Sequence, residues 1–223
     1  MTGKLFWEAI TKFLLGVALT GLLLFVPAGT LLYPGGLLLM VALFLPMLIA
    51  GVVMMVKNPK LLASRLDGKE KQKEQGALIK LSGLMFVVGF IVAGLDHRLS
   101  LTTIPRWLSY AAVGLLLLSY LMWAEVLREN AYLSRTVKVE AGQRVVDTGL
   151  YGVVRHPMYL ATLLMFVPMP LILQSFWGLC VFAVYPILIV VRIVNEEKLL
   201  SAELDGYAEY KKKVRYRLIP FVW

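Results

Sequence analysis

The sequence is poor in the residues that bind metals or form covalent cross-links. It has one cysteine and two histidines among 223 residues. The lone Cys180 excludes an intramolecular disulfide, and no Cys/His spacing predicts a metal site, so no metal is expected. Cys180 lies in an apolar segment, which favours a small buried residue. There is also no G-x-G-x-x-G after a strand, so a soluble dinucleotide-binding domain is not expected. No Ser/His/Asp constellation is evident, so covalent catalysis by a serine nucleophile is not expected.

Acidic residues are scarce as well, with 14 Asp and Glu against 23 Lys and Arg and a net charge of +9. Such an excess can indicate nucleic-acid binding. Here, however, the basic residues alternate with apolar runs and do not cover one soluble face, so no nucleic-acid partner is expected. Apolar residues make up 59% of the chain and the mean hydropathy is +0.75, whereas soluble domains are about 45–50% apolar. The sequence therefore predicts a multi-pass membrane protein whose first partner is the lipid bilayer.

Six continuous apolar runs approach the roughly 20 residues that cross a bilayer. Only helices or closed barrels satisfy the backbone in lipid, and these runs lack the alternation of a barrel strand. We therefore expect an all-α integral membrane fold with six transmembrane helices, capped by a cytosolic loop and a C-terminal helix. The expected spans are Ile10–Val26, Gly36–Val56, Ala77–Leu95, Trp107–Leu127, Met158–Leu173 and Phe176–Val194.

The basic residues predict the orientation of these spans. Of the 23 Lys and Arg, 21 fall on one side of the six-span arrangement and only Arg98 and Arg106 on the other. The positive-inside rule then places both termini in the cytosol. The membrane would be the plasma membrane in a prokaryote and the endoplasmic reticulum in a eukaryote. Asp96, His97 and Arg98 are expected to form a solvated turn on the outer side.

Two polar clusters fall on the predicted cytosolic side. The first polar cluster, residues 149–159, contains Arg155-His156-Pro157-Met158-Tyr159. Its proline suits the first turn of a helix, whose N-terminus favours an anion. The second polar cluster, residues 192–198, places Arg192 and Glu196 four residues apart on one helix face. Each cluster alone is equally compatible with residues that merely anchor the chain at the interface. Glu125 could join a site or be held by Arg128 or Arg192.

Taken together, the clusters resemble the isoprenylcysteine carboxyl methyltransferase family, integral-membrane enzymes related to the phospholipid N-methyltransferases. The resemblance covers roughly residues 130–223. The apolar runs place four membrane spans in residues 1–127. The resemblance makes residues 128–223 the catalytic region, formed by the cytosolic loop, a transmembrane hairpin and an amphipathic helix over residues 196–213. The matching residues are Gly149, Tyr151, Arg155, His156, Pro157, Tyr159, Arg192, Glu196, Glu197, Tyr207, Tyr210 and Pro220.

The resemblance implies S-adenosylmethionine as cofactor and a lipid or small apolar methyl acceptor, such as an isoprenylcysteine carboxylate. It assigns catalysis to Arg192 and Glu196, and substrate binding to Arg192 and Arg155. The residues assigned to cofactor binding are Gln143, Arg144, Val145, Val146, Tyr151, His156, Pro157, Met158, Tyr159, Glu196 and Glu197. Methyl transfer from a sulfonium needs no covalent enzyme intermediate, so positioning and electrostatics supply most of the catalysis.

Two other functions fit the same residues. Membrane sterol reductases, which use NADPH, carry a similar Arg-His-Pro-x-Tyr hairpin, but usually with an acidic residue soon after the tyrosine, where this chain has Leu160-Ala161-Thr162. A non-catalytic membrane scaffold with a degenerate site is the second alternative. The presence of both Arg192 and Glu196 favours an enzyme.

Overall fold

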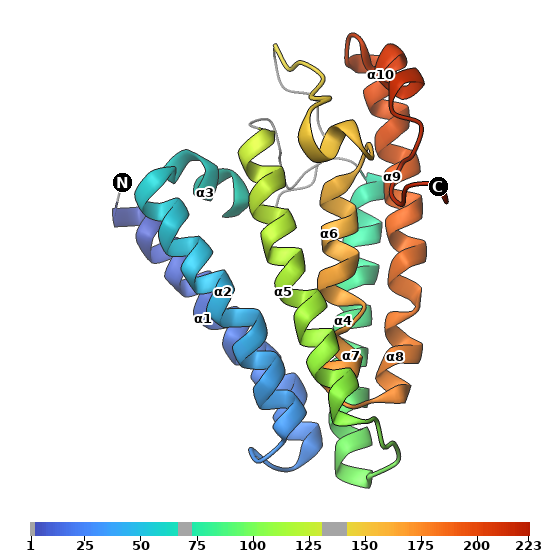
Figure 1. Ribbon diagram of the computed structural model, residues 1–223. Helices are drawn as coiled ribbons and strands as arrows, with labels where there is room; N and C mark the ends of the chain where they lie inside the picture. The colour runs from blue at the N-terminus through green and yellow to red at the C-terminus, as the bar shows by residue number, and fades with distance from the viewer. Residues whose placement is uncertain (1–2, 67–72, 131–141) are drawn as a thin grey trace.

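The computed structural model describes residues 3–66, 73–130 and 142–223, which form helices joined by turns, with no strand in these ranges (Figure 1). The all-α prediction is confirmed for this part of the chain. The elements in order are α1 (Gly3–Ala28), α2 (Pro34–Lys57), α3 (Pro59–Leu66), α4 (Lys73–Leu99), α5 (Arg106–Glu129), the 3-10 helix η1 (Gly149–Gly152), α6 (Pro157–Phe166), α7 (Met169–Ile172), α8 (Phe176–Phe182), α9 (Val184–Glu203) and α10 (Tyr207–Lys213).

Five helical segments are long and apolar enough to cross a membrane: α1, α2, α4, α5 and the α8–α9 segment. The fifth predicted span corresponds to the shorter apolar segment Pro157–Ile172, which rises only about 24 Å against a hydrocarbon core of roughly 30 Å. This segment is divided into α6 and α7 around Pro168, a residue that cannot donate a backbone hydrogen bond. Five of the six predicted spans therefore have spanning length in the described residues.

The helices run up and down, so that the connections gather at two ends (Figure 1). The α1–α2, α4–α5 and α7–α8 turns lie at the lower end, whereas α3, η1 and α10 lie at the upper end. Both polar clusters belong to the upper end, because one leads into α6 and the other lies in the second half of α9. The assignment of this end to the cytosol stays a prediction.

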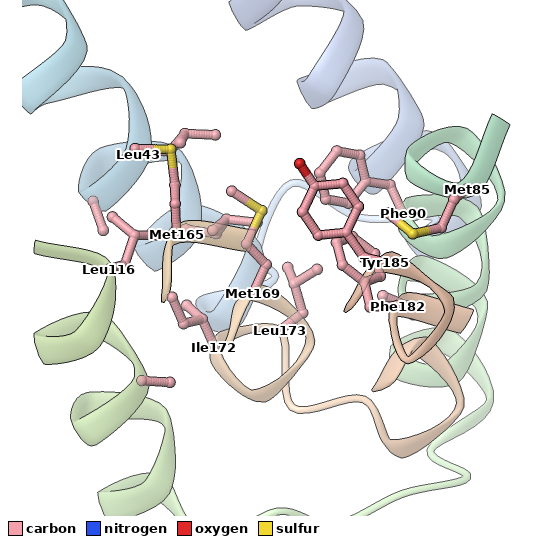
Figure 2. Close-up of a cluster of buried hydrophobic side chains, with 14 of the residues drawn as sticks. Leu43, Met85, Phe90, Leu116, Met165, Met169, Ile172, Leu173, Phe182 and Tyr185 are labelled. Carbon is pink, nitrogen blue, oxygen red and sulfur yellow. The ribbon is translucent and has the colours of Figure 1, made fainter. Parts of the chain in front are cut away.

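A layer of aromatic rings joins α4, α6, α8 and α9 below the polar clusters. The ring of Phe86 lies 4.8 Å from that of Phe166 and 5.4 Å from that of Phe182, and Tyr185 completes the layer. Figure 2 shows Tyr185 and Phe182 beside Phe90, with Met165 and Met169 further along the same core. A Cβ on Gly89 would lie 2.3 Å from the Phe182 ring, so α4 needs glycine there to approach α8. Cys180, expected to be buried, is instead exposed on α8.

The prediction of a solvated turn at Asp96, His97 and Arg98 is wrong. All three residues belong to the last turn of α4, and Asp96 is buried. Its Oδ2 accepts hydrogen bonds from Ser175 Oγ at 2.6 Å and Thr102 Oγ1 at 2.8 Å. Ser175 Oγ also accepts from the Gly178 backbone nitrogen and thereby caps α8. Asp96 thus fixes the α7–α8 turn to α4 and to the start of α5.

Asp96→Ala is expected to lower the free energy of unfolding by about 2–4 kcal/mol, because the buried hydroxyl of Ser175 and the half-buried hydroxyl of Thr102 lose their acceptor. Thermal denaturation in detergent measures this loss. Asp205→Ala, at an exposed position, serves as the matched control and should leave stability nearly unchanged. Equal stability of Asp96→Ala and the wild type would contradict a structural role for the buried carboxylate.

The predicted helix over residues 196–213 is interrupted. α9 ends at Glu203, and α10 begins at Tyr207 after Gly206, which has φ of +80°. This left-handed conformation strongly favours glycine and ends the helical path. The break turns α10 away from the axis of α9 (Figure 1). The expected cytosolic loop before the fifth span lies partly outside the described residues, and its described part contains η1.

Candidate functional site

Tyr159 joins the two polar clusters. Its hydroxyl accepts a hydrogen bond from Arg192 Nε at 2.9 Å and donates to Glu196 Oε2. The Arg192 guanidinium also lies 5.9 Å from the centre of the Tyr159 ring. Tyr159 is buried on α6, whereas Arg192 and Glu196 are partly exposed on α9. The predicted meeting of the two clusters is present in the structure, and the phenol holds the cation and the carboxylate on one face.

Glu197, the next residue along α9, has different surroundings. It is 6% exposed and is surrounded by cations. Its Oε1 accepts from Arg155 Nε at 2.7 Å and lies 3.3 Å from His156 Nε2, while its Oε2 accepts from Arg217 Nε at 2.8 Å. Adjacent helix positions point about 100° apart, so Glu196 and Glu197 face different sides of α9. Glu196 therefore contacts Tyr159, whereas Glu197 contacts Arg155 and Arg217.

The chain after α10 is fixed to the first polar cluster through its backbone. Arg155 and His156 donate backbone hydrogen bonds to the carbonyls of Tyr216 and Arg217, at 2.9 and 2.8 Å. Arg155 Nη1 also donates to the carbonyls of Val214 and Arg215, at 2.8 Å each. With Glu197 on its Nε, Arg155 is a buried junction between α9, the start of α6 and the tail.

η1 is held between α5 and α10. The Tyr151 hydroxyl accepts from Asn130 Nδ2 at 3.1 Å, and its carbonyl accepts from the Tyr210 hydroxyl at 2.8 Å. Glu129 Oε2 accepts from the Leu150 backbone nitrogen. A Cβ on Gly149 would overlap the Glu129 carboxylate, at 1.4 Å from Oε1, and Gly149 has φ of +50°, so this position requires glycine. Burial raises the pKa of Tyr151 to about 12, and its phenol stays neutral at physiological pH.

The two tyrosines of α10 pack over the other side of the site with Leu204 and Val214. Burial, followed by the negative charges of Glu197 and Glu196, raises the pKa of Tyr207. Its hydroxyl is buried and has no hydrogen-bond partner among the described residues. Tyr207 thus brings a neutral, available hydroxyl close to both glutamates. The sequence pattern included Tyr207, but the site assignment did not.

The remaining predicted site residues are less closely grouped. Pro157 is buried as the first residue of α6, and Met158 packs against the apolar core. Val145 packs against the α10 tyrosine cluster, Val146 is half-buried, and Arg144 is exposed. Gln143 is half-buried and has a contact of its own. Near them, Lys213 lies 2.6 Å from Asp147, and this hydrogen bond lowers the pKa of the Asp147 carboxyl.

Two features at this end were not predicted. Arg217 was counted only as a topogenic charge, although it completes the set of cations around Glu197. Gln75 precedes the expected third span and has no predicted role, yet it lies in the first turn of α4, is 0% exposed and reaches the Arg192 backbone carbonyl. Glu125, by contrast, is held by Arg128 at 2.6 Å, which was one of the expected outcomes. In the described residues no group of His, Cys, Asp and Glu side chains could hold a metal ion.

The helices and these contacts define a membrane protein with a polar site at one end of an apolar bundle. Residues 106–204 match the model of the phospholipid methyltransferase family. This stretch is therefore similar to a methyltransferase family, and the resemblance predicted from the sequence is confirmed. The match begins at α5, earlier than expected, and stops at Leu204, before α10. The chain is also 27% identical over 157 residues to the uncharacterized protein YpbQ of Bacillus subtilis strain 168, covering 67% of this chain and 93% of that protein.

Proposed function

We propose that the protein uses S-adenosylmethionine to methylate a lipid or small apolar acceptor at the upper end of the bundle. The observation that carries this proposal is the Tyr159 hydroxyl, which bridges Arg192 and Glu196 between two apolar helices. The match of α5 to α9 to a methyltransferase family supports it further. That match favours methyl transfer over the NADPH-dependent reductase and over a scaffold. The cytosolic location of this end is part of the same proposal.

The residues present fit such a cofactor. S-adenosylmethionine carries a carboxylate, an ammonium group and ribose hydroxyls, and when bound it supplies an electrophilic methyl group on sulfur for in-line displacement. Glu196 offers a carboxylate that can accept from an ammonium or a hydroxyl. The Tyr207 hydroxyl, buried and without a hydrogen-bond partner among the described residues, is a further polar group available close by. Orphaned buried polar groups are rare in native proteins, so such a hydroxyl is expected to find its partner in a ligand.

Each residue then has a distinct task. We propose that Glu196 binds the cofactor, and that Arg192, held in place by Tyr159, binds the polar end of the acceptor. An arginine can bind a carboxylate or phosphate through two donors. Arg155 and Glu197 were expected to contact ligands, but their donors and acceptors engage each other, Arg217 and the tail. We therefore propose that they position the site and do not bind substrate or cofactor.

Calorimetric titration of purified protein with S-adenosylhomocysteine tests the proposal. Wild-type protein is expected to bind, and Glu196→Gln should weaken binding about 10-fold or more, because a charge-assisted hydrogen bond is lost. Glu203→Gln, on the exposed end of the same helix, is the matched control and should bind like the wild type. Absence of binding by the wild type at millimolar ligand would reject the proposed function. Equal affinity of Glu196→Gln would remove Glu196 from the site.

A further inference from the structure

Gln75 is a buried polar residue outside the stretch that matches the methyltransferase family. It lies in the first turn of α4, two residues after the helix begins, and is 0% exposed. Its Nε2 donates to the Arg192 backbone carbonyl on α9 across 3.5 Å, at the limit of a hydrogen bond. Its Oε1 is buried and has no hydrogen-bond partner in the described ranges 3–66, 73–130 and 142–223.

The orientation of the Gln75 amide follows from its neighbour. The Arg192 carbonyl can only accept, so the amide nitrogen must face it and the oxygen must face away. Within α9 that carbonyl also accepts from the Glu196 backbone nitrogen. The amide therefore lies beside the helical turn that carries both Arg192 and Glu196. Turning the amide over would therefore not give the buried oxygen a partner at this carbonyl.

A buried acceptor without a partner costs about 1–3 kcal/mol. A methionine would fill similar space in an apolar helix contact without this cost, since α4 and α9 pack directly against each other. One long hydrogen bond to a carbonyl that is already bonded stabilises the contact between these helices less than the unpaired oxygen destabilises it. A polar partner supplied by a ligand would explain why an amide stands there.

From this placement, we propose that Gln75 is a cofactor-binding residue whose Oε1 accepts a hydrogen bond from the methyl donor. This inference rests on the proposed function. The chemistry distinguishes the two substrates, because S-adenosylmethionine has an ammonium, ribose hydroxyls and an adenine amino group to donate. A carboxylate acceptor has no hydrogen to donate to an amide oxygen. α4 thus adds a fourth helix to a site otherwise made by α6, α9 and α10.

Gln75→Met tests this assignment, because it keeps the length of the side chain and removes both polar atoms. Affinity for S-adenosylhomocysteine is measured by calorimetry, and the Tm of ligand-free protein is measured in the same detergent. We expect the Kd to rise about 10-fold while the Tm stays within about 2 °C of the wild type or increases. Ser82→Ala, also on α4, removes a hydroxyl that bonds only its own helix and serves as the control for both measurements.

The result separates the inference from the proposed function. If the wild type binds and Gln75→Met binds with a Kd within twofold, Gln75 is not a ligand and the inference is overturned. A lowered Tm overturns it too, whatever the Kd, since the amide would then act as an interhelical contact. Failure of the wild type itself to bind would overturn the proposed function, and the inference with it.

Discussion

Replacing Glu197 with alanine is expected to lower the free energy of unfolding by about 3–5 kcal/mol, the usual loss when a buried ion pair is deprived of one partner. Glu197 is 6% exposed, and its carboxylate is the anion that Arg155 and Arg217 share. Within the described part of the chain, its removal leaves the buried Arg155 guanidinium with the carbonyls of Val214 and Arg215 as its partners. The segment after α10 should then separate from the start of α6.

Thermal denaturation and limited trypsin digestion measure the two parts of this effect. In Glu197→Ala, cleavage after Lys211, Lys212 and Lys213 should become faster, together with a lower Tm. Glu209→Ala removes an exposed carboxylate from the same tail and should change neither quantity appreciably. An unchanged Tm for Glu197→Ala would mean that Arg155 and Arg217 are stable without their shared anion, which would contradict the structural role.

Replacing Arg192 with alanine is expected to reduce the turnover number about 100-fold, the order of loss when a reactant is no longer held in its reactive position. The guanidinium is oriented by Tyr159, which donates in turn to Glu196, so its direction toward an acceptor is fixed before binding. Arg192→Lys should recover little of the loss, because a lysine lacks the fork of donors that binds an anion through two atoms. Tyr159→Phe should give an intermediate rate, since the ring remains and only the bridge is lost.

The rates are measured with methyl-labelled cofactor and a native membrane lipid extract, and cofactor affinity is measured on the same preparations. For Arg192→Ala the Kd for S-adenosylhomocysteine should change less than about threefold while turnover falls, because the residue is assigned to the acceptor. Arg128→Ala is the control, as Arg128 is an exposed arginine paired with Glu125. A wild-type rate in Arg192→Ala would exclude this residue from the reaction, and an equal loss of affinity would reassign it to the cofactor.

The helices were predictable because lipid leaves few alternatives to a continuous apolar helix. The expected spans Gly36–Val56 and Trp107–Leu127 lie within α2 and α5, and each differs from the helix bounds by a few residues. The fifth span was harder to predict, because its apolar composition does not show that the helix is interrupted around Pro168. The tail was misjudged for a similar reason. Its apolar spacing continues through Leu204, while the left-handed Gly206 ends the helical path.

Within the site, the sequence predicted which clusters meet but not how the charges pair. Arg192 and Glu196 were recognised by their four-residue spacing, whereas Tyr159 enters between them from a different helix. Glu197 and Arg155 are 42 positions apart, and many basic residues at this end were equally plausible partners. Local spacing carries no information on such a pairing. The burial of Gln75 and Asp96 was not predicted for another reason. Each lies next to charged residues in the sequence, and such a segment is expected to be exposed to solvent.

The backbone bonds from Arg155 and His156 to Tyr216 and Arg217 also set an order of events during biosynthesis. A chain emerging from the ribosome inserts α6 well before residues 214–217 exist as partners for Arg155. Until then the guanidinium and, later, the Glu197 carboxylate must remain hydrated at the membrane surface, because neither can be buried alone without a large desolvation penalty. The start of α6 can complete its contacts only after the tail has been translated, because the Val214–Arg217 carbonyls and the Arg217 side chain come last. The full set of polar contacts at this end therefore forms after translation of residue 217, even when the preceding helices are already inserted in the membrane.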